Sequence, residues 1–366
     1  MKILQIIPSL GSGGAERFVV DLCNELSHQG EDVCLCIVQN PEESDYGFYL
    51  PDLDPSVKFI SLQQSKGFSF KNIKLFHQVI QEIKPNVIHG HLGVLLYFYV
   101  LKLLNWNAQF FYTIHTLAEK SSPGFLNRGI NLFYFGLKLI KTITISNECN
   151  KSYKQYYGLS NACMINNGRS ALQQSLLFQN IKEEVRKFKK NDSDLVFIHI
   201  ARYYSQKNQK VLINAFNQLS KEYPNVILLI LGDWSHCSEA IELTSQAGEN
   251  IYIIGTKPNV ADYLLLSDAF CLTSLYEGLP ISLIEAISCG CVPICTAVGG
   301  IVDVVSHGVN GYLSVNTDET SYLNTLKLFL NQPLAISKET LINLYKNNYS
   351  ISQSAVLHIS LYHKNK

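Results

Sequence analysis

Two carboxylates stand in the stretch YEGLPISLIEAISCGCVPICT, residues 276–296, which contains no Lys or Arg. Pro280 suits the first position of a helix and Gly290 suits its end, so Glu277 is expected in the loop before this helix and Glu285 about one turn inside it. An acid at a helix start is stabilised by unpaired amides and by the positive end of the dipole. Carboxylates also accept hydrogen bonds from vicinal hydroxyls, as on a ribose. The pair is therefore expected to bind hydroxyls on either side of a phosphate, one Glu those of a sugar and the other those of a ribose.

Two cations, Arg202 and Lys207, follow the apolar run LVFIHI at residues 195–200. Such a run is typical of a buried parallel strand, so both cations are expected in a strand-to-helix loop. Ligands of doubly wound sheets bind outside the carboxyl ends of the strands. There, an Arg fork and a Lys point charge can converge on one anion. The alternative is that both are ordinary solvated side chains.

A glycine-rich segment, SLGSGGAER at residues 9–17, follows the first apolar run of the chain. A dinucleotide fingerprint needs G-x-G-x-x-G and an acid about 20 residues later, but Glu16 stands where the third Gly belongs. Nicotinamide-type binding is therefore not expected. The turn from Gly11 to Gly14 instead presents unpaired amides at a helix amino terminus, which suits a phosphate. An ordinary tight turn is the alternative.

These loops require a scaffold of parallel strands. Short apolar runs alternate with helical patterns along the chain, which is the pattern of a doubly wound α/β sheet. The alternation lapses over one polar, charged segment and then restarts, so two such sheets are expected. The strands are expected at 2–8, 32–39, 86–91, 109–115 and 141–146, and then at 195–200, 226–232, 251–255, 269–274 and 292–296.

The same alternation predicts the domain organisation. A chain of 366 residues exceeds the size at which a single core keeps growing. We predict one Rossmann-like domain at 1–170, a linker at 171–193 and a second Rossmann-like domain at 194–332. The remaining segment, 333–366, is predicted to be a helical tail that packs back toward the N-terminal domain.

The charges are balanced overall but unevenly distributed. The chain has 30 basic and 30 acidic residues, which excludes a chain-wide electrostatic hold on nucleic acid or membrane. Residues 58–169, however, hold thirteen basic and three acidic residues. This segment contains no known nucleic-acid readout motif, so nucleic acid is not an expected partner.

Cysteines and apolar runs give no sign of a metal framework or a membrane span. The ten Cys form no CxxC, and the pairs Cys34/Cys36 and Cys289/Cys291 are read as small buried hydrophobes of a reducing cytosol. The start, MKILQIIP, is too short an apolar run for a signal peptide. The longest apolar run, at 92–104, is interrupted by Lys102 and is too short to cross a bilayer.

The motifs together resemble a known enzyme family. The stretch YEGLPISLIEAISCGCVPI resembles the E-x7-E signature of family 4 retaining glycosyltransferases, which have the GT-B fold of two Rossmann-like domains facing a cleft. Further segments fall in the order of that family. These are SGGAER, VIHGHLG, TIHT, TIS, NNG, ARYYSQKN, LLILGD and VGGIVDVVSHGVNGYL.

The resemblance implies a role for each matching residue. Gly13 and Gly14 are expected to approach the diphosphate and the transferred sugar, and Arg202 with Lys207 to clamp the leaving diphosphate. Glu277 is expected to bond the donor sugar and Glu285 the ribose. The donor site would also include Gly278, Leu279, Pro280 and Ile281. His115 resembles the family's cleft histidine, which contacts the sugar; the alternative is a buried structural histidine.

The resemblance also implies a reaction. A sugar would move with retention from a nucleoside-diphosphate sugar, with UDP-sugar as the first candidate, to a glycan or lipid-linked glycan of cell-surface polysaccharide. Residues 1–170 would form the acceptor side and 194–332 the nucleotide-sugar side. Neither Glu need act as a nucleophile or a base, because the acceptor would attack on the same face and the departing phosphate would take the acceptor proton. No cofactor is expected beyond the donor substrate.

Metal dependence is not expected. The D-x-D pairs Asp52/Asp54 and Asp192/Asp194 both precede strands, whereas ligands gather after strands, so both pairs are read as solvated loops.

The basic segment 58–169 suggests a second partner. Its part at 125–142, FLNRGINLFYFGLKLIKT, mixes Arg128, Lys138 and Lys141 with aromatics and would suit an anionic bilayer as an amphipathic helix. Packing against the sheet is the equal alternative. The expected location is the cytoplasm, either free or attached to the inner face of the membrane.

Two rival functions use the same architecture. One is a nucleotide-sugar 2-epimerase, which would need acids and histidines at the sugar and no acceptor. The other is a non-catalytic partner that binds nucleotide-sugar for another transferase. The E-x7-E stretch disfavours the first, and the presence of Arg202, Lys207, Glu277 and Glu285 disfavours the second.

Overall fold

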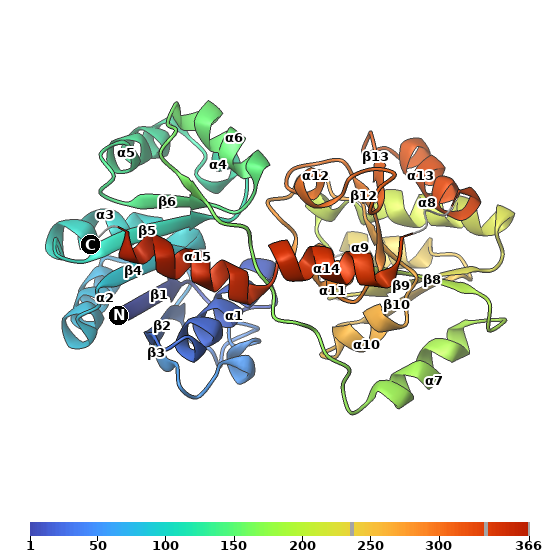
Figure 1. Ribbon diagram of the computed structural model, residues 1–366, viewed down its shortest axis with the longest axis horizontal. Coiled ribbons are helices and arrows are strands. Elements are labelled where there is room, and N and C mark those ends of the chain that lie inside the picture. The colour runs from blue at the N-terminus through green and yellow to red at the C-terminus, as the bar shows by residue number, and fades with distance from the viewer. Residues whose placement is uncertain (235–237, 333–335, 365–366) are drawn as a thin grey trace. The chain divides into compact units, whose positions relative to one another are not determined.

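A computed structural model describes residues 1–234, 238–332 and 336–364. The chain divides into two compact units (Figure 1). The first unit comprises Met1–Ser170 and Asn348–Lys366, and the second comprises Ala171–Asn347. Each unit is built on one parallel sheet, as the alternation of apolar runs and helical patterns predicts.

The sheet of the first unit has seven strands in the order β3-β2-β1-β4-β5-β6-β7. Its order reverses between β1 and β4, so the loops that follow these two strands leave the sheet at the switch point. The strands are β1 (Lys2–Ile7), β2 (Asp32–Gln39), β3 (Lys58–Gln64), β4 (Val87–His91), β5 (Gln109–Ile114), β6 (Lys141–Thr144) and β7 (Cys163–Met164).

Helices cover both faces of this sheet. One face carries an apolar core made with α2, α3, α5 and α6, and α1 packs against α15 beside the strands. The helices are α1 (Gly14–His28), α2 (Phe70–Ile83), α3 (Leu95–Leu104), α4 (Ala118–Ser121), α5 (Phe125–Gly136), α6 (Asn147–Tyr157) and α15 (Ile351–His363), with short turns η1 (Leu50–Asp52) and η2 (Leu92–Val94).

The first helix shows how the sequence specifies these elements. Phe18, Leu22 and Leu26 recur at helical spacing and are buried against the sheet. The helix then stops because Gly30 adopts a left-handed conformation, with φ of 89°, that other residues rarely reach. The residue before its first turn is Gly13, which has no side chain that could cap the helix.

The sheet of the second unit has six strands in the order β10-β9-β8-β11-β12-β13. Here the order reverses between β8 and β11. The strands are β8 (Leu195–Ile200), β9 (Val226–Leu231), β10 (Ile251–Gly255), β11 (Ala269–Leu272), β12 (Val292–Thr296) and β13 (Tyr312–Ser314).

The helices of the second unit again flank the sheet. An apolar core joins the strands to α8, α9 and α13, and α11 packs on β11 and β12. The helices are α7 (Phe178–Phe188), α8 (Gln209–Glu222), α9 (Ser238–Ser245), α10 (Val260–Leu265), α11 (Ile281–Ser288), α12 (Ile301–Val304), α13 (Glu319–Asn331) and α14 (Lys338–Asn348), with a short turn η3 (Ser205–Lys207).

The expected strands all form, and three further strands were not expected. β3 is half exposed, β7 is two exposed residues, and β13 is three residues long. Each is short or polar and lies at or near a sheet edge, so none carries the continuous apolar run of a central strand.

The boundary between the units differs from the predicted linker at 171–193. This segment carries α7 and falls within the second unit, where Ile181 and Val185 are buried and Glu184 pairs with Lys257 and Tyr263. Its polar face is solvated, which is why the apolar periodicity lapses there. The tail predicted at 333–366 is divided: α14 lies in the second unit up to Asn347, and α15 belongs to the first.

Most described cysteines are buried, as expected for small apolar side chains. Cys163 is exposed, whereas Cys34, Cys36, Cys289 and Cys291 are buried. Burial raises the pKa of the Cys34 thiol to about 12. Cys237 lies outside the described residues. Within the described ranges, no helix is long and apolar enough to span a bilayer.

Candidate functional site

The structure brings Lys207 and Glu277 together in the second unit. Nζ of Lys207 lies 2.6 Å from Oε1 of Glu277, and Oγ of Ser274 donates to the same oxygen at 2.6 Å. Glu277 is buried and Lys207 is partly exposed. A cation and a hydroxyl that bond the same oxygen fix the orientation of this carboxylate. Because an ammonium has three donors, Lys207 keeps donors for an anion in addition to Glu277.

Both loops that carry this pair leave the sheet at its switch point. Lys207 ends the turn η3 after β8, and Glu277 follows β11, the neighbouring strand. Two hydrogen bonds at Gln206 tie the loops to each other: its side chain donates to the carbonyl of Tyr276 at 2.7 Å, and its carbonyl accepts from the amide of Leu275 at 2.8 Å. The switch point is where doubly wound sheets bind ligands.

Gly299 makes room for the loop of Glu277. It follows β12 and has φ of 52°, and a Cβ at this position would overlap the backbone of Glu277. Only glycine fits this combination of close approach and left-handed backbone. The loop after β12 therefore supports the position of the acid.

Arg202 is exposed and leaves the sheet in the same loop as Lys207. Its backbone carbonyl accepts from the Gln209 side chain at 2.9 Å, which fixes the start of the loop. Gly232 follows the neighbouring strand β9, and its φ of 137° lets its backbone approach Ala201 closely. The structure thus places Arg202 and Lys207 at one strand end.

Glu285 is the fifth residue of α11, so it lies about one turn inside the helix, as expected. The helix begins at Ile281, one residue later than predicted: Pro280 has ψ of 125°, an extended conformation, and is the residue before the helix. Pro280 has no N–H, so of the segment 278–281 only Gly278, Leu279 and Ile281 can offer amides to a ligand. This segment is buried.

In the first unit, Gly13 and Gly14 stand at the amino end of α1. Gly13 is the residue before the helix, and its extended backbone, with φ of −110°, brings it close to the Glu16 side chain. Gly13 has no side chain that could cap the helix. Backbone amides at a helix start favour an anion. The loop itself is held by Asp45, which accepts from the amide of Ser12 at 3.4 Å.

His115 follows β5 and belongs to a group of histidines on one face of the sheet. Its Nε2 lies 2.9 Å from Nδ1 of His91, and Nε2 of His91 lies 2.8 Å from Oε1 of Gln5. Nδ1 of His115 is buried and has no protein partner among the described residues. Burial, with a smaller contribution from His358, lowers the pKa of His115 to about 3. His115 is therefore a neutral side chain that is neither fully buried nor fully hydrogen-bonded.

Several residues of the site were not singled out in the sequence. The hydroxyl of Ser274 donates to Glu277, and the hydroxyl of Thr273 donates to the carbonyl of Lys207 at 2.9 Å. Gly299 leaves room for the backbone of Glu277. The hydroxyls at the end of AFCLTS are a usable signal, since polar residues that end an apolar strand lie at the ligand edge of the sheet. The motif HGH is a second signal: alternate residues of a strand share a face, so His89 and His91 are expected on the same side of the sheet.

The two D-x-D pairs make local contacts. Asp52 pairs with Arg17, and Asp54 accepts from Ser56, which lowers its pKa to about 2. Asp192 pairs with Arg186, and Asp194 accepts from the backbone amides of Lys190 and Asn191. Within the described segments, no group of His, Cys, Asp and Glu has the arrangement of a metal site.

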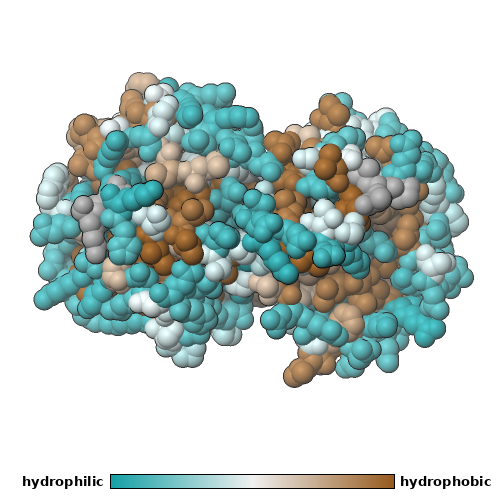
Figure 2. All heavy atoms as spheres, in the orientation of Figure 1, coloured by the Kyte–Doolittle hydropathy of each residue, from teal (hydrophilic) through white to brown (hydrophobic). Residues whose placement is uncertain are grey.

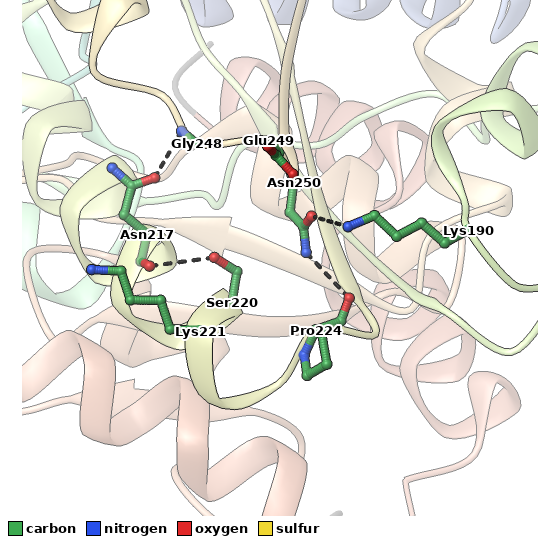
Figure 3. A pocket seen from close by; sticks show the side chains of 8 residues that line it. All are labelled: Lys190, Asn217, Ser220, Lys221, Pro224, Gly248, Glu249 and Asn250. Atoms are coloured by element: carbon green, nitrogen blue, oxygen red, sulfur yellow. Dashed lines mark hydrogen bonds between the residues drawn. The ribbon is translucent and has the colours of Figure 1, made fainter.

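A surface depression in the second unit lies at the other end of its sheet (Figure 3). It is lined by residues that precede β9 and β10, including Pro224 and Asn250. Asn250 accepts from Lys190 at 3.3 Å and donates to the carbonyl of Pro224 at 3.3 Å, so its polar groups are already paired. Since doubly wound sheets bind at their carboxyl ends, this depression is not the donor site.

Two family models cover most of the chain. The one described as Glycosyltransferase Family 4 matches residues 12–171, and the one described as Glycosyl transferases group 1 matches residues 180–350. The matched segments include Gly13, Gly14, His115, Lys207 and Glu277.

Individual relatives and solved structures agree with this match. The capsular polysaccharide biosynthesis glycosyltransferase CapH of Staphylococcus aureus is 24% identical over 92% of this chain and 93% of its own length. The Escherichia coli UDP-Gal:alpha-D-GlcNAc-diphosphoundecaprenol alpha-1,3-galactosyltransferase is 22% identical over 94% of this chain and 89% of its own length. The fold matches that of Anabaena HepE in complex with UDP and glucose, with a TM-score of 0.81 at 16% identity over all of both chains. With two doubly wound units, a paired Lys and Glu at one switch point and both family models matched, the chain is a glycosyltransferase that belongs to family 4 and has the GT-B fold.

Proposed function

We propose that this protein transfers a sugar with retention from a nucleoside-diphosphate sugar, UDP-sugar first, to a glycan or lipid-linked glycan in cell-surface polysaccharide biosynthesis. The observation that supports this most directly is the Lys207–Glu277 pair, a cation and a buried acid in contact at the switch point of the second unit. The solved structure of HepE holds UDP and glucose, and the Staphylococcus aureus relative is named for capsular polysaccharide biosynthesis.

The proposed chemistry uses cations rather than an acid–base pair. Charge develops on the leaving diphosphate, and Arg202 and Lys207 with the helix start at Gly13 and Gly14 would stabilise it. Glu277, fixed by Lys207 and Ser274, would accept from hydroxyls of the sugar. Its carboxylate is already an ion-pair partner, which suits an orienting role better than attack on the sugar. The acceptor would enter on the face of the departing phosphate, which removes the acceptor's proton.

We further propose that no metal ion or other cofactor is needed. The acids of both D-x-D pairs are engaged by Arg17, Ser56, Arg186 and backbone amides, so they are not grouped to hold a cation on a diphosphate. Transfer measured in the presence of a chelator should stay within about twofold of the untreated rate. Loss of activity that manganese restores would contradict this part of the proposal.

A thermal melting screen tests the donor. Melting of the wild type with UDP, GDP, ADP and their common sugars should show a shift with one diphosphate, because a ligand that binds the folded state raises the midpoint. Glu285→Ala should reduce that shift if Glu285 bonds the ribose. Glu249→Ala, which changes an acid at the opposite end of the sheet, is the matched control and should leave the shift unchanged. No shift with any nucleotide would contradict donor binding by this chain.

Product analysis separates transfer from the rival reaction. A labelled sugar should leave the nucleotide only when an acceptor is present, and the anomeric linkage of the product should match that of the donor. An epimer formed without acceptor would indicate an epimerase, and an inverted linkage would contradict retention.

We also propose that the first unit attaches to an anionic membrane surface on the cytoplasmic face. Large apolar side chains of α5 are exposed, among them Phe125 at 89% and Leu126 at 75%. α3 lies beside α5, since the ring centres of Tyr99 and Tyr134 are 4.8 Å apart. Leu103 of α3 and Trp106, which follows this helix, are also exposed. Figure 2 shows hydrophobic spheres over the part of the first unit where Figure 1 places α5.

Cations near this apolar surface would favour anionic lipid, although some of them bond to the protein. Lys102 is buried and donates to the carbonyls of Trp106 and Ala108, and Arg128 donates to the carbonyl of Tyr156 and lies over its ring. Lys138 is exposed. Helix α5 therefore has two sides. Asn131 and Phe135 are buried, whereas Phe125 and Leu126 are exposed and do not pack against the sheet.

Liposome flotation tests the attachment. Full-length protein should float with vesicles that contain anionic lipid and less with neutral vesicles, since both apolar contact and charge contribute. The double variant Phe125→Ser, Leu126→Ser should reduce binding by about tenfold or more. Leu176→Ser, which changes a fully exposed leucine of the second unit, is the control. Absence of binding to either vesicle would rule the attachment out.

A further inference from the structure

A continuous chain of hydrogen bonds links β1, β4, β5 and α15 inside the first unit. Oγ1 of Thr113 lies 2.7 Å from Nε2 of His89, whose Nδ1 lies 2.7 Å from the hydroxyl of Tyr362. That hydroxyl accepts from Nε2 of Gln5 at 3.4 Å. Gln5 then continues the chain through His91 to His115. Apart from His115, every member of this chain is buried.

The order of donors and acceptors along the chain fixes where His115 carries its proton. The amide oxygen of Gln5 faces His91, and an amide oxygen can only accept, so Nε2 of His91 is the donor. In a neutral imidazole the other nitrogen is then an acceptor. Nδ1 of His91 therefore accepts from Nε2 of His115 at 2.9 Å. This leaves Nδ1 of His115 without a proton.

That nitrogen is an acceptor that the protein leaves unused. Nδ1 of His115 is buried and has no partner among the described residues, although the ring as a whole is partly exposed. An unsatisfied buried acceptor costs free energy that a ligand hydroxyl could recover. His115 directly follows β5, at the carboxyl end of the sheet, where ligands bind.

We propose that Gln5 and His91 are positioning residues that hold His115 as its Nε2–H tautomer, so that Nδ1 accepts a hydrogen bond from a hydroxyl of the bound sugar. This inference rests on the proposed function for its substrate. It assigns two buried residues outside the donor motifs a role in sugar selection. Burial also keeps the pKa of His115 at about 3, so the ring stays neutral and retains one acceptor nitrogen at physiological pH.

The first test needs no substrate. In full-length protein with 15N-labelled histidine, long-range 1H–15N spectra report which ring nitrogen carries the proton. We expect His91 and His115 both to be protonated at Nε2. A proton on Nδ1 of His115 would overturn the proposal, because the chain would then run in the opposite direction and present a donor.

Two variants of His91 separate tautomer control from packing. In His91→Asn, the side-chain oxygen can take the place of Nδ1 and accept from His115, so His115 should keep its Nε2 proton. In His91→Leu, this acceptor is lost and both tautomers of His115 should appear. Gln5→Met should release the tautomers of His91 and His115 while keeping side-chain length. Unchanged tautomers in both His91→Leu and Gln5→Met would overturn the relay.

The kinetic test uses donors that each lack one hydroxyl. With the wild type, one deoxy donor should show kcat/KM lower by about tenfold or more, as a site built to bond a hydroxyl discriminates against its loss. Gln5→Met should lose most of that discrimination, and His91→Asn should retain it. Asn131→Leu, which removes another buried amide of the first unit without touching the histidines, should also retain it. Equal discrimination in the wild type and Gln5→Met would contradict the proposal.

The two arms also separate this inference from the function on which it rests. An enzyme that transfers no sugar but shows His115 protonated at Nε2, with release in His91→Leu, would contradict the proposed function and support the relay. An active enzyme in which Nδ1 of His115 carries the proton would support the proposed function and contradict the relay.

Discussion

The ammonium of Lys207 and Oε1 of Glu277 are 2.6 Å apart, with side chains 23% and 8% exposed. Lys327 and Glu222 lie at the same distance in the same unit, but their side chains are 27% and 54% exposed. The two pairs therefore share their geometry and differ chiefly in the burial of the acid. A buried carboxylate that loses its partner remains desolvated, whereas an exposed one is rehydrated.

The first prediction is that Lys207 supports stability as well as chemistry. Lys207→Met should lower the free energy of unfolding by about 2–4 kcal/mol, because it leaves Glu277 buried and unpaired. Lys327→Met should lower it by less than about 1 kcal/mol. Urea unfolding monitored by circular dichroism measures both.

The double variant Lys207→Met, Glu277→Gln isolates the pair. Removal of both charges should recover at least about half of the stability lost in Lys207→Met, since no buried charge then lacks a partner. Transfer activity should stay lost in the double variant. Equal destabilisation by Lys207→Met and Lys327→Met would show that burial of Glu277 is unimportant.

The contact between Lys207 and Glu277 was only partly predictable from the sequence. Each residue could be placed after a strand by the apolar runs that precede it, and a switch point gathers such loops. Their direct pairing depends on which strands are neighbours, and β8 lies beside β11 although about 70 positions separate them in the chain. Local patterns carry no such information. The contribution of Ser274 depends on the same long-range register.

The fold was more predictable than its edges and boundaries. Strands buried on both faces carry continuous apolar runs, and those runs located the central strands of both sheets. The strand β3 and the helix α7 present one solvated face, so their apolar residues are too few to stand out. The assignment of α15 to the first unit depends on tertiary contacts such as Ser354 with the carbonyl of Asn166. A helical pattern predicts the helix and not its partner.

The second prediction concerns Gly299. Gly299→Ala should destabilise the protein by about 2 kcal/mol or more and weaken donor binding further, because the new methyl group overlaps the backbone of Glu277 and the left-handed φ of 52° becomes strained. Gly308→Ala is the matched control: φ there is 76°, and nothing lies within 4 Å of the added Cβ. That control should cost only the strain, about 1 kcal/mol. A similar loss in both variants would show that the approach to Glu277 is not tight.

The third prediction is a loss of stability in mild acid. Burial is the main cause that lowers the pKa of His199 and His358 to about 4 and that of His115 to about 3, against 6.5 in an unfolded chain. Below 6.5 the unfolded chain therefore binds more protons than the native one, so stability is full above this pH and falls as pH drops toward 4. Each histidine should contribute about 1 kcal/mol of loss for the first pH unit.

Urea midpoints at three pH values between about 7.5 and 5.5 measure this loss. His199→Gln should flatten the dependence by about 1 kcal/mol over the last pH unit, because one neutral buried imidazole is removed. A dependence as steep in His199→Gln as in the wild type would show that this histidine takes up its proton in the native state as readily as in the unfolded chain.

The fourth prediction is that α15 stabilises the first unit through one of its faces. Tyr362 is fully buried against the strands that carry His89 and Phe111, and Leu357 of the same helix is 49% exposed. Tyr362→Ala should cost about 3–5 kcal/mol through lost burial and a cavity, and Leu357→Ala less than about 1 kcal/mol. Hydrogen exchange should show the loss in β4 and β5 of the first unit before it appears in the strands of the second, since the two units have separate cores. Equal effects of the two variants, or exchange that rises equally in both units, would mean that α15 is not an integral part of the first unit's core.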